Sequence, residues 1–221
     1  MTLEATTTFE IGKNRIEALS DGIFAIVMTL LILEIHVPNL PSTAANVEVA
    51  PALIALWPKF ATYLVTFLSL GVFWVSHHMM YHVIRRADRV LLWLNIFFFM
   101  FVAVLPFSTS VLNAFPQAFI APFLFGLNLA IIGWILFLQW SYADSRPGVL
   151  ATFASPEYRS AVRFRMLVVP VVTTLTAFIC FWSVAISLAI YLLLLPVYLL
   201  PAKFERKGNI LSKPVTVADN G

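Results

Sequence analysis

The amino-acid sequence predicts an all-α integral membrane protein with six transmembrane helices, and its composition, its apolar segments and its charge distribution favour this fold class. Of the 221 residues, 61% are hydrophobic and 11% are charged, whereas a soluble domain carries about 25% charged residues. Charge this sparse cannot cover a surface that faces water, so lipid must be the main solvent. The length accommodates six spans of about 20 residues with short connections. The sequence therefore predicts a single transmembrane domain over residues 1–221.

Six apolar segments are long enough to cross a bilayer as helices. Their approximate bounds are Leu19–Ile35, Trp57–Met80, Val90–Leu112, Phe115–Tyr142, Arg165–Trp182 and Ser183–Leu200. The last two spans follow one another without a linker, so we expect them to form a helical hairpin. Glu4 and Glu10 precede the first span where a cleavable signal would carry a short basic segment, and we expect that span to remain in the mature protein.

The basic residues indicate how these spans are oriented. Thirteen of the fourteen Lys and Arg residues fall on one side: in the N-terminal segment, in the links between spans two and three and between spans four and five, and in the C-terminal tail. The positive-inside rule places that side, and with it both termini, in the cytoplasm. The net charge of +3 is attributed to loops that face an anionic bilayer surface. No basic run is interleaved with exposed aromatic residues, so nucleic-acid binding is not expected.

Polar residues at the start of the first span need an explanation. An ionised carboxylate at membrane depth costs roughly 2–3 kcal/mol or more when it is unpaired, so Asp21 requires partners. Arg15 lies six residues earlier, and its long side chain can reach toward that level. Because the second and third spans carry His77 and Asn95 near the same side of the membrane, we predict one buried hydrogen-bond network that includes Asp21. The competing interpretation is a simple helix cap made by Ser20 and Asp21 at the interface.

A stripe of residues follows Asp21 along the first span. Its members share one face of a helix by their spacing, and they are Gly22, Ile26, Thr29, Leu33 and His36. The stripe is mostly apolar and contains one hydroxyl. On the residues alone, an ordinary helix-packing face is the favoured interpretation.

Metal binding and enzymatic activity are not expected. His78 and His82 share a helix face at i, i+4 spacing, but such a pair more often bonds to a carboxylate or a lipid headgroup than to a metal. The chain contains four histidines in all, too few for the histidine boxes of a di-iron membrane oxygenase. No nucleophile–base pair or metal-ligand set is visible, so we predict no enzyme, no metal and no cofactor.

Three motifs occur along the first three spans, namely Arg15 to Asp21 (R-x-x-x-F-S-D), Phe73 to His78 (W-x-x-H-H), and Asp88 to Asn95 together with Leu105 to Thr109 (the third-span pattern). In their order and spacing these motifs resemble the transmembrane-protein-175 family of potassium channels. Leu19 stands where the family usually has Phe, a departure expected to loosen the packing around Ser20 and Asp21.

The resemblance implies a cation channel that prefers potassium over sodium, with permeant potassium ions and the lipid bilayer as its partners. It also implies a prokaryotic cell-membrane protein with one six-span unit per chain, assembled as a homotetramer whose first helices surround the pore. By offset from Asp21, the narrowest layer falls on Ile26, with Thr29 and Leu33 in the layers beyond. The polar set that would hold the first span in place is Arg15, Ser20, Asp21, His77 and Asn95.

The pore that this resemblance implies would differ from that of potassium channels with a carbonyl-lined filter. No T-V-G-Y-G loop occurs in the chain, so a carbonyl-lined filter of that kind is not expected. A narrow ring of Ile26 side chains is dry and would act as a hydrophobic gate. Thr29 hydroxyls would replace part of the hydration water of an ion, and Leu33 would form a second apolar ring.

Two other classes of function stay open. In a secondary transporter or a proton-conducting channel, Asp21 and a histidine would titrate during the cycle. No inverted repeat is visible, and the middle of each span carries almost no charge. A membrane scaffold without transport activity is the other alternative.

Overall fold

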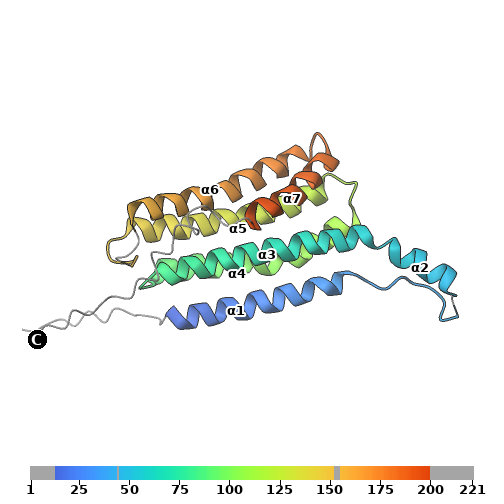
Figure 1. Ribbon diagram of the computed structural model, residues 1–221, viewed down its shortest axis with the longest axis horizontal. Helices are drawn as coiled ribbons and strands as arrows, with labels where there is room; N and C mark the ends of the chain where they lie inside the picture. The colour runs from blue at the N-terminus through green and yellow to red at the C-terminus, as the bar shows by residue number, and fades with distance from the viewer. Residues whose placement is uncertain (1–12, 44, 152–154, 200–221) are drawn as a thin grey trace, which may run out of the picture.

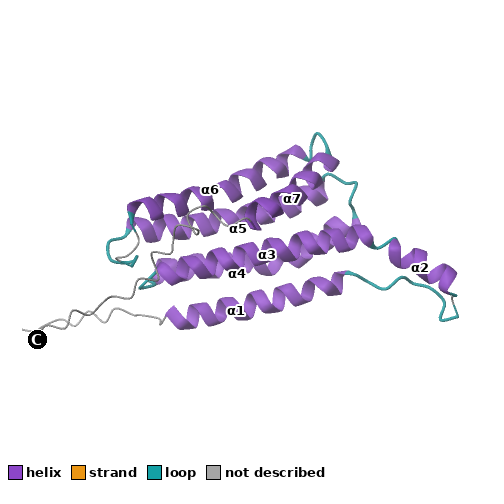
Figure 2. Cartoon of the chain, viewed as in Figure 1, coloured by secondary structure: helices purple, strands orange, loops and turns teal. Residues whose placement is uncertain are grey.

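The computed structural model of the chain describes residues 13–43, 45–151 and 155–199, and over these residues it consists of helices and connecting loops (Figure 2). The elements are α1 (Lys13–Leu30), the 3₁₀ helix η1 (Leu31–Glu34), α2 (Asn46–Ile54), α3 (Trp57–Val83), α4 (Arg89–Ala114), α5 (Ile120–Ser145), α6 (Pro156–Ile179) and α7 (Val184–Leu199). The all-α fold class is thus confirmed for the described residues.

Among the described residues, five helices are long and apolar enough to cross a membrane, namely α1 with η1, α3 with α2, α4, α5 and α6. The described part of α7 has 16 residues, or roughly 24 Å of helix, whereas a hydrocarbon core is about 30 Å thick. A sixth span formed by α7 therefore stays a prediction. The expected hairpin of α6 and α7 is present, and the Ser187 hydroxyl donates to the Thr176 carbonyl oxygen across it (3.0 Å).

The long helices run side by side along the long axis of the molecule (Figure 1). Helices α3 and α4 lie in the middle, α5, α6 and α7 lie on one side of them, and α1 lies on the other. Helix α5 packs against α4 and α6, whereas α1 contacts α3, α4 and its own continuation η1. Helix α1 therefore occupies an edge of the bundle, and one of its faces has no partner among the described helices.

The described arginines gather toward one end of the bundle, which we call the basic end. There α1, α4 and α6 begin and α3 and α5 finish (Figure 1). The arginines are Arg15, Arg85, Arg86, Arg89, Arg146, Arg159, Arg163 and Arg165. Lys59 lies near the start of α3, at the opposite end. This separation is the one expected from the sequence, and the assignment of the basic end to the cytoplasm stays a prediction.

Backbone and side-chain contacts join the two halves of the bundle at the basic end. The Arg85 N–H donates to the Val149 carbonyl oxygen (2.8 Å), and the Ala151 N–H donates to the Val83 carbonyl oxygen (2.9 Å). The Tyr142 hydroxyl donates to Asp88 Oδ2 (2.5 Å). The α3–α4 loop and the α5–α6 loop are therefore held against each other.

The predicted start of the fifth span at Arg165 is wrong, because α6 begins nine residues earlier at Pro156. Ser155 caps this helix, with its hydroxyl accepting from the Tyr158 N–H (3.2 Å), and Pro156 suits the first helical position. Arg159 pairs with the Asp144 carboxylate and also donates to the Asp144 carbonyl oxygen (2.7 Å). These contacts stabilise a charged first turn that the hydropathy pattern assigned to a linker.

Two further differences concern the first third of the chain. Helix α1 begins at Lys13, six residues before the predicted Leu19, and its α-helical part ends at Leu30. Helix α2 was not predicted at all, because its nine residues contain Pro51 and are too few for a span.

Close packing in the α5–α7 region yields a stability prediction. A Cβ added at Gly126 would overlap the Tyr191 hydroxyl and lie 2.7 Å from its Cζ atom, and Tyr191 is buried. We expect Gly126→Ala to destabilise the protein by about 1–3 kcal/mol, as overpacking of a core usually does. Thermal unfolding in detergent measures the effect. Gly71→Ala is the matched control, since nothing lies within 4 Å of a Cβ at Gly71, and an equal loss for both variants would contradict the packing argument.

Candidate functional site

Helix α1 has two faces of different character. Its buried face packs against α3 and α4 with residues spaced by four, four, three and four, namely Ile16, Ser20, Phe24, Val27 and Leu31. This spacing keeps every member on one side of an α-helix. The opposite face carries Gly22, Ile26, Thr29 and Leu33, all of which are exposed in the single chain. Ile26 and Thr29, two of the three residues predicted to line a pore, therefore share the exposed face of α1.

The exposed face is apolar except for one hydroxyl. Ile26 is 60% exposed and Leu33 is 66% exposed. The Thr29 hydroxyl lies 3.0 Å from the Ala25 carbonyl oxygen and 2.8 Å from the Ile26 carbonyl oxygen, so its proton is committed to the backbone. A hydroxyl oxygen retains lone pairs when its proton is donated. Thr29 can therefore offer an oxygen, and no donor, to a group outside the helix.

The far end of the predicted stripe needs correction. Leu33 lies in η1, whose 3₁₀ form ends at Glu34, and His36 lies beyond the helix. A 3₁₀ helix advances about 120° per residue rather than 100°, so Leu33 is turned roughly 60° further round the axis than a continuous α-helix would place it. Ile26 and Thr29 keep α-helical register with Gly22, whereas Leu33 does not.

A buried polar network joins the back of α1 to the two helices behind it. The Asn95 Oδ1 atom lies 2.8 Å from His77 Nε2, and the Ser20 hydroxyl lies 3.2 Å from His77 Nδ1. Because Oδ1 only accepts, Nε2 carries the proton, and in the neutral imidazole Nδ1 accepts from Ser20. The three residues belong to α1, α3 and α4, so His77 connects three helices through two bonds.

Aromatic rings enclose the imidazole of His77. The Tyr81 ring stacks on it at a centroid distance of 4.5 Å, and the Phe98 ring lies nearly parallel to it at 5.2 Å. His77 is 1% exposed and Asn95 is 3% exposed. A buried polar group is costly when its hydrogen bonds are not made. Because a rotation of α1 would break the bond between Ser20 and the buried His77, this network fixes the orientation of α1 on the bundle.

Asp21 lies outside this network, contrary to the sequence prediction. Its Oδ1 atom instead accepts from Trp74 Nε1 (2.8 Å), and Asp21 is exposed. Neighbouring residues point about 100° apart around a helix, so with Ser20 facing His77, Asp21 must face away from it. Trp74 is the tryptophan of the W-x-x-H-H motif, three residues before His77, and its indole N–H was the sign in the sequence of a donor for Asp21.

Arg15 is also outside the network. It is exposed, and it makes no ion pair with Asp21 among the described side chains. Six helical residues correspond to roughly 600°, which leaves the two side chains about 120° apart around the axis. Distance along the helix alone, without this rotation, would place the two side chains within reach of each other.

No group of three His, Cys, Asp or Glu side chains that could hold a metal occurs within the described part of the chain. Of the predicted polar set, the structure thus brings together Ser20, His77 and Asn95, and it places Arg15 and Asp21 elsewhere.

Comparison with known proteins gives a consistent family. The family model described as "Endosomal/lysosomal potassium channel TMEM175" matches residues 15–106, which contain most of α1, all of α3 and part of α4. A potassium channel of Chamaesiphon minutus is 35% identical over 200 residues, covering 86% of this chain and 96% of that protein. A crystal structure of a lysosomal potassium-selective channel TMEM175 homolog from Chamaesiphon minutus has a TM-score of 0.74 and 28% identity, covering 84% of this chain and 95% of that chain.

Two other relatives match over shorter stretches. A potassium channel of Streptomyces collinus is 44% identical over 100 residues, and the match spans 47% of its length and 45% of this chain. The human endosomal/lysosomal proton channel TMEM175 is 37% identical over 112 residues, which cover 48% of this chain and 22% of that protein.

Proposed function

This chain belongs to the TMEM175 family, and we propose that it is a potassium-permeable cation channel whose pore is lined by α1 from four copies of the chain. The resemblance found in its three motifs is confirmed, and the family consists of ion channels rather than enzymes. We place the channel in the cell membrane of a prokaryote, with the basic end in the cytoplasm, where the excess of arginine belongs.

One observation carries the proposal: α1 lies at the edge of the bundle, and Gly22, Ile26 and Thr29 are exposed on the face of α1 that no other described helix covers. Small residues allow two membrane helices to approach each other closely, whereas a face that contacts only lipid does not require them. Ala18, Gly22 and Ala25 are exposed on this side of α1. Four copies of α1 can therefore come together near the basic end.

In such an assembly Ile26 forms the constriction. It follows Lys13, the first residue of α1, by 13 positions, which is roughly 20 Å along the axis and well within the bilayer. A narrow ring of isoleucine side chains excludes water and closes the pore by dewetting. Conduction then requires α1 to move outward enough to admit a partly hydrated ion.

Thr29 supplies the oxygens that an ion meets next to this ring. Its proton is held by the backbone, so four hydroxyl oxygens would face the axis as acceptors. A neutral hydroxyl is a weak-field ligand, and the field strength of the ligands is one of the determinants of selectivity between potassium and sodium. We assign the preference for potassium to this layer, and Leu33 forms a further apolar ring on the side away from the basic end.

Ion flux from liposomes tests the function. Purified protein is reconstituted into vesicles loaded with potassium or with sodium, and efflux down the gradient is followed with an ion-sensitive dye. We expect passive potassium efflux that is faster than sodium efflux and that needs no proton gradient. A potassium flux that stops unless protons move in the opposite direction would identify a coupled transporter and contradict the channel.

Proton conduction is a second candidate, favoured by the exposed carboxylate of Asp21 on α1, five residues before Ile26. His77 is a poor proton carrier here because it is enclosed by aromatic rings. If protons permeate, we expect Asp21→Asn to lower proton flux about tenfold while potassium flux stays within a factor of two, since one carboxylate proton site is lost and the pore layers are intact. The paired measurement uses a pH dye and a potassium dye on the same vesicles, and Glu17→Gln serves as the control acid one turn earlier. An equal fall of both fluxes would show that Asp21 acts on the pore and not on protons.

A further inference from the structure

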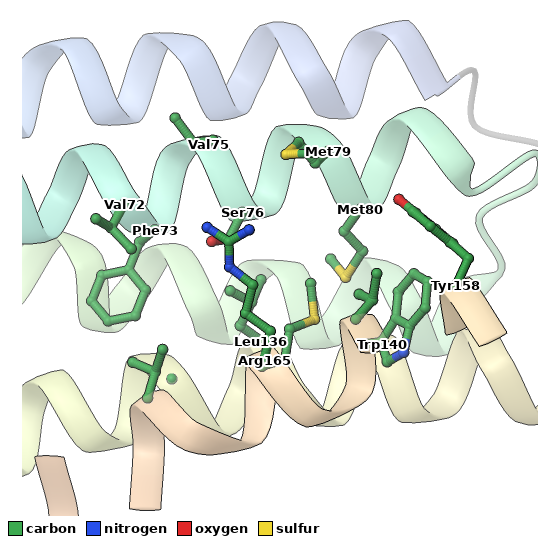
Figure 3. Close-up of a pocket in the computed structure, with 14 residues that line it drawn as sticks. Val72, Phe73, Val75, Ser76, Met79, Met80, Leu136, Trp140, Tyr158 and Arg165 are labelled. Carbon is green, nitrogen blue, oxygen red and sulfur yellow. The ribbon is translucent and has the colours of Figure 1, made fainter. Parts of the chain in front are cut away.

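A pocket of about 80 Å³ lies between α3, α5 and α6 (Figure 3). Its walls are mainly apolar and include Phe73, Met80, Leu136, Met166 and Val169. None of the residues that line it is an Asp or a Glu. It is separate from the exposed face of α1, which lies on the other side of α3 (Figure 1).

The position of the pocket along the helices indicates which leaflet of the bilayer it faces. It extends along α3 from residue 72 to residue 80, and α3 finishes at Val83. The deepest of these residues is therefore roughly 16 Å from the basic end of the helix, about half the thickness of a hydrocarbon core. The pocket thus belongs to the leaflet at the basic end.

Of the residues that line the pocket, one is cationic, namely Arg165. Figure 3 shows the guanidinium of Arg165 reaching from α6 across the pocket toward Ser76 on α3. Arg165 is exposed. A guanidinium presents a planar fork of donors that matches the oxygens of a phosphate, and it is desolvated more readily than an ammonium group.

We propose that this pocket binds one anionic phospholipid from the leaflet at the basic end. The phosphate lies against Arg165, with the Ser76 hydroxyl as a second donor, and the start of an acyl chain lies along the apolar wall. Basic pockets between transmembrane helices are a recurring way of holding lipid headgroups. An anionic headgroup fits better than a zwitterionic one, because the latter brings its own cation to a site that already holds an arginine.

Binding is measured on the purified full-length chain in detergent, so the test does not depend on the channel activity. Phosphatidylglycerol and phosphatidylcholine with identical acyl chains are titrated, and native mass spectrometry counts the bound lipids while thermal unfolding reports stabilisation. We expect one phosphatidylglycerol per chain to be retained, a rise in melting temperature that phosphatidylcholine does not match, and no rise with inorganic phosphate. Equal stabilisation by the two lipids would overturn the proposal.

Neighbouring arginines provide the matched variants. Arg165→Gln is expected to weaken phosphatidylglycerol binding about fivefold, in line with the loss of one basic contact near a membrane surface. Arg163→Gln removes the same charge from the same helix at a residue that does not line the pocket, and it should leave the affinity within a factor of two. Equal losses for both variants would mean that the lipid senses only the surface charge.

A third variant tests the apolar wall. Val162 lines the pocket and is half-buried, so Val162→Phe should fill the space, reduce retention of the lipid severalfold and leave the melting temperature without lipid unchanged. One more outcome would overturn the proposal, namely that Arg165→Gln folds and its melting temperature falls by the same amount with and without lipid. In that case Arg165 would stabilise the chain without contributing to the binding of the lipid.

Discussion

Replacing Ile26 with asparagine is expected to raise passive potassium flux at least about tenfold and to bring sodium flux close to it. The ring of apolar side chains is the proposed barrier, and a polar ring that lowers this barrier by as little as about 1.4 kcal/mol gives a tenfold rise. The variant should fold, because Ile26 is 60% exposed and lies on the face of α1 opposite the one that packs against α3 and α4. Efflux from liposomes, with potassium and sodium measured separately, checks both parts of the prediction.

Ile186→Asn is the matched control for this experiment. Ile186 is 55% exposed and lies on α7, so the same change is made at a similar exposure on a helix that is not proposed to line the pore. Its potassium flux should stay within a factor of two of the unchanged protein. If Ile186→Asn raised flux as Ile26→Asn does, the leak would come from general loosening in the membrane, and the pore assignment would have to be abandoned.

The fold was largely predictable because each long helix is a long apolar run. The start of α6 was not, since its first turns carry Arg159, Arg163 and Arg165 and look like a linker by hydropathy. What makes them helical is the cap at Ser155 and the pairing of Arg159 with Asp144. The second of these is a contact between residues on different helices, which no local pattern reveals.

The depth of the site along the membrane normal was predictable, but the rotation of α1 about its own axis was not. In a soluble protein the buried face of a helix is the apolar one, but in a membrane both faces of α1 are apolar, so hydropathy does not distinguish them. Ser20 and Asp21 are adjacent polar residues, and only the structure shows that Ser20 faces His77 while Asp21 accepts from Trp74. The roles of Ile26, Thr29 and Leu33 depend on a neighbouring copy of the chain and stay predictions.

His77→Ala is expected to destabilise the protein by about 3 kcal/mol or more. A hydrogen bond between membrane helices contributes only about 0.6 kcal/mol on average, so the two bonds of His77 account for the smaller part. The larger part comes from the cavity left between Tyr81 and Phe98, since truncation of a large buried side chain usually costs about 2–5 kcal/mol. Thermal unfolding in detergent measures the loss of stability. His77→Phe keeps a ring but makes neither hydrogen bond, so its melting temperature should lie between those of His77→Ala and the unchanged protein.

His78→Ala is the control, because His78 is the adjacent residue, is exposed and stacks only on the exposed Trp74. Its effect should stay within about 0.5 kcal/mol, as for most surface substitutions. The consequence for the channel follows from geometry: His77 holds Ser20 inward, and this sets the rotation that turns Ile26 and Thr29 outward. His77→Ala should therefore also lower the selectivity between potassium and sodium, although it touches no residue of the exposed face. A variant that melts at the unchanged temperature and keeps full selectivity would mean that the apolar contacts of Phe24 and Val27 suffice to orient α1.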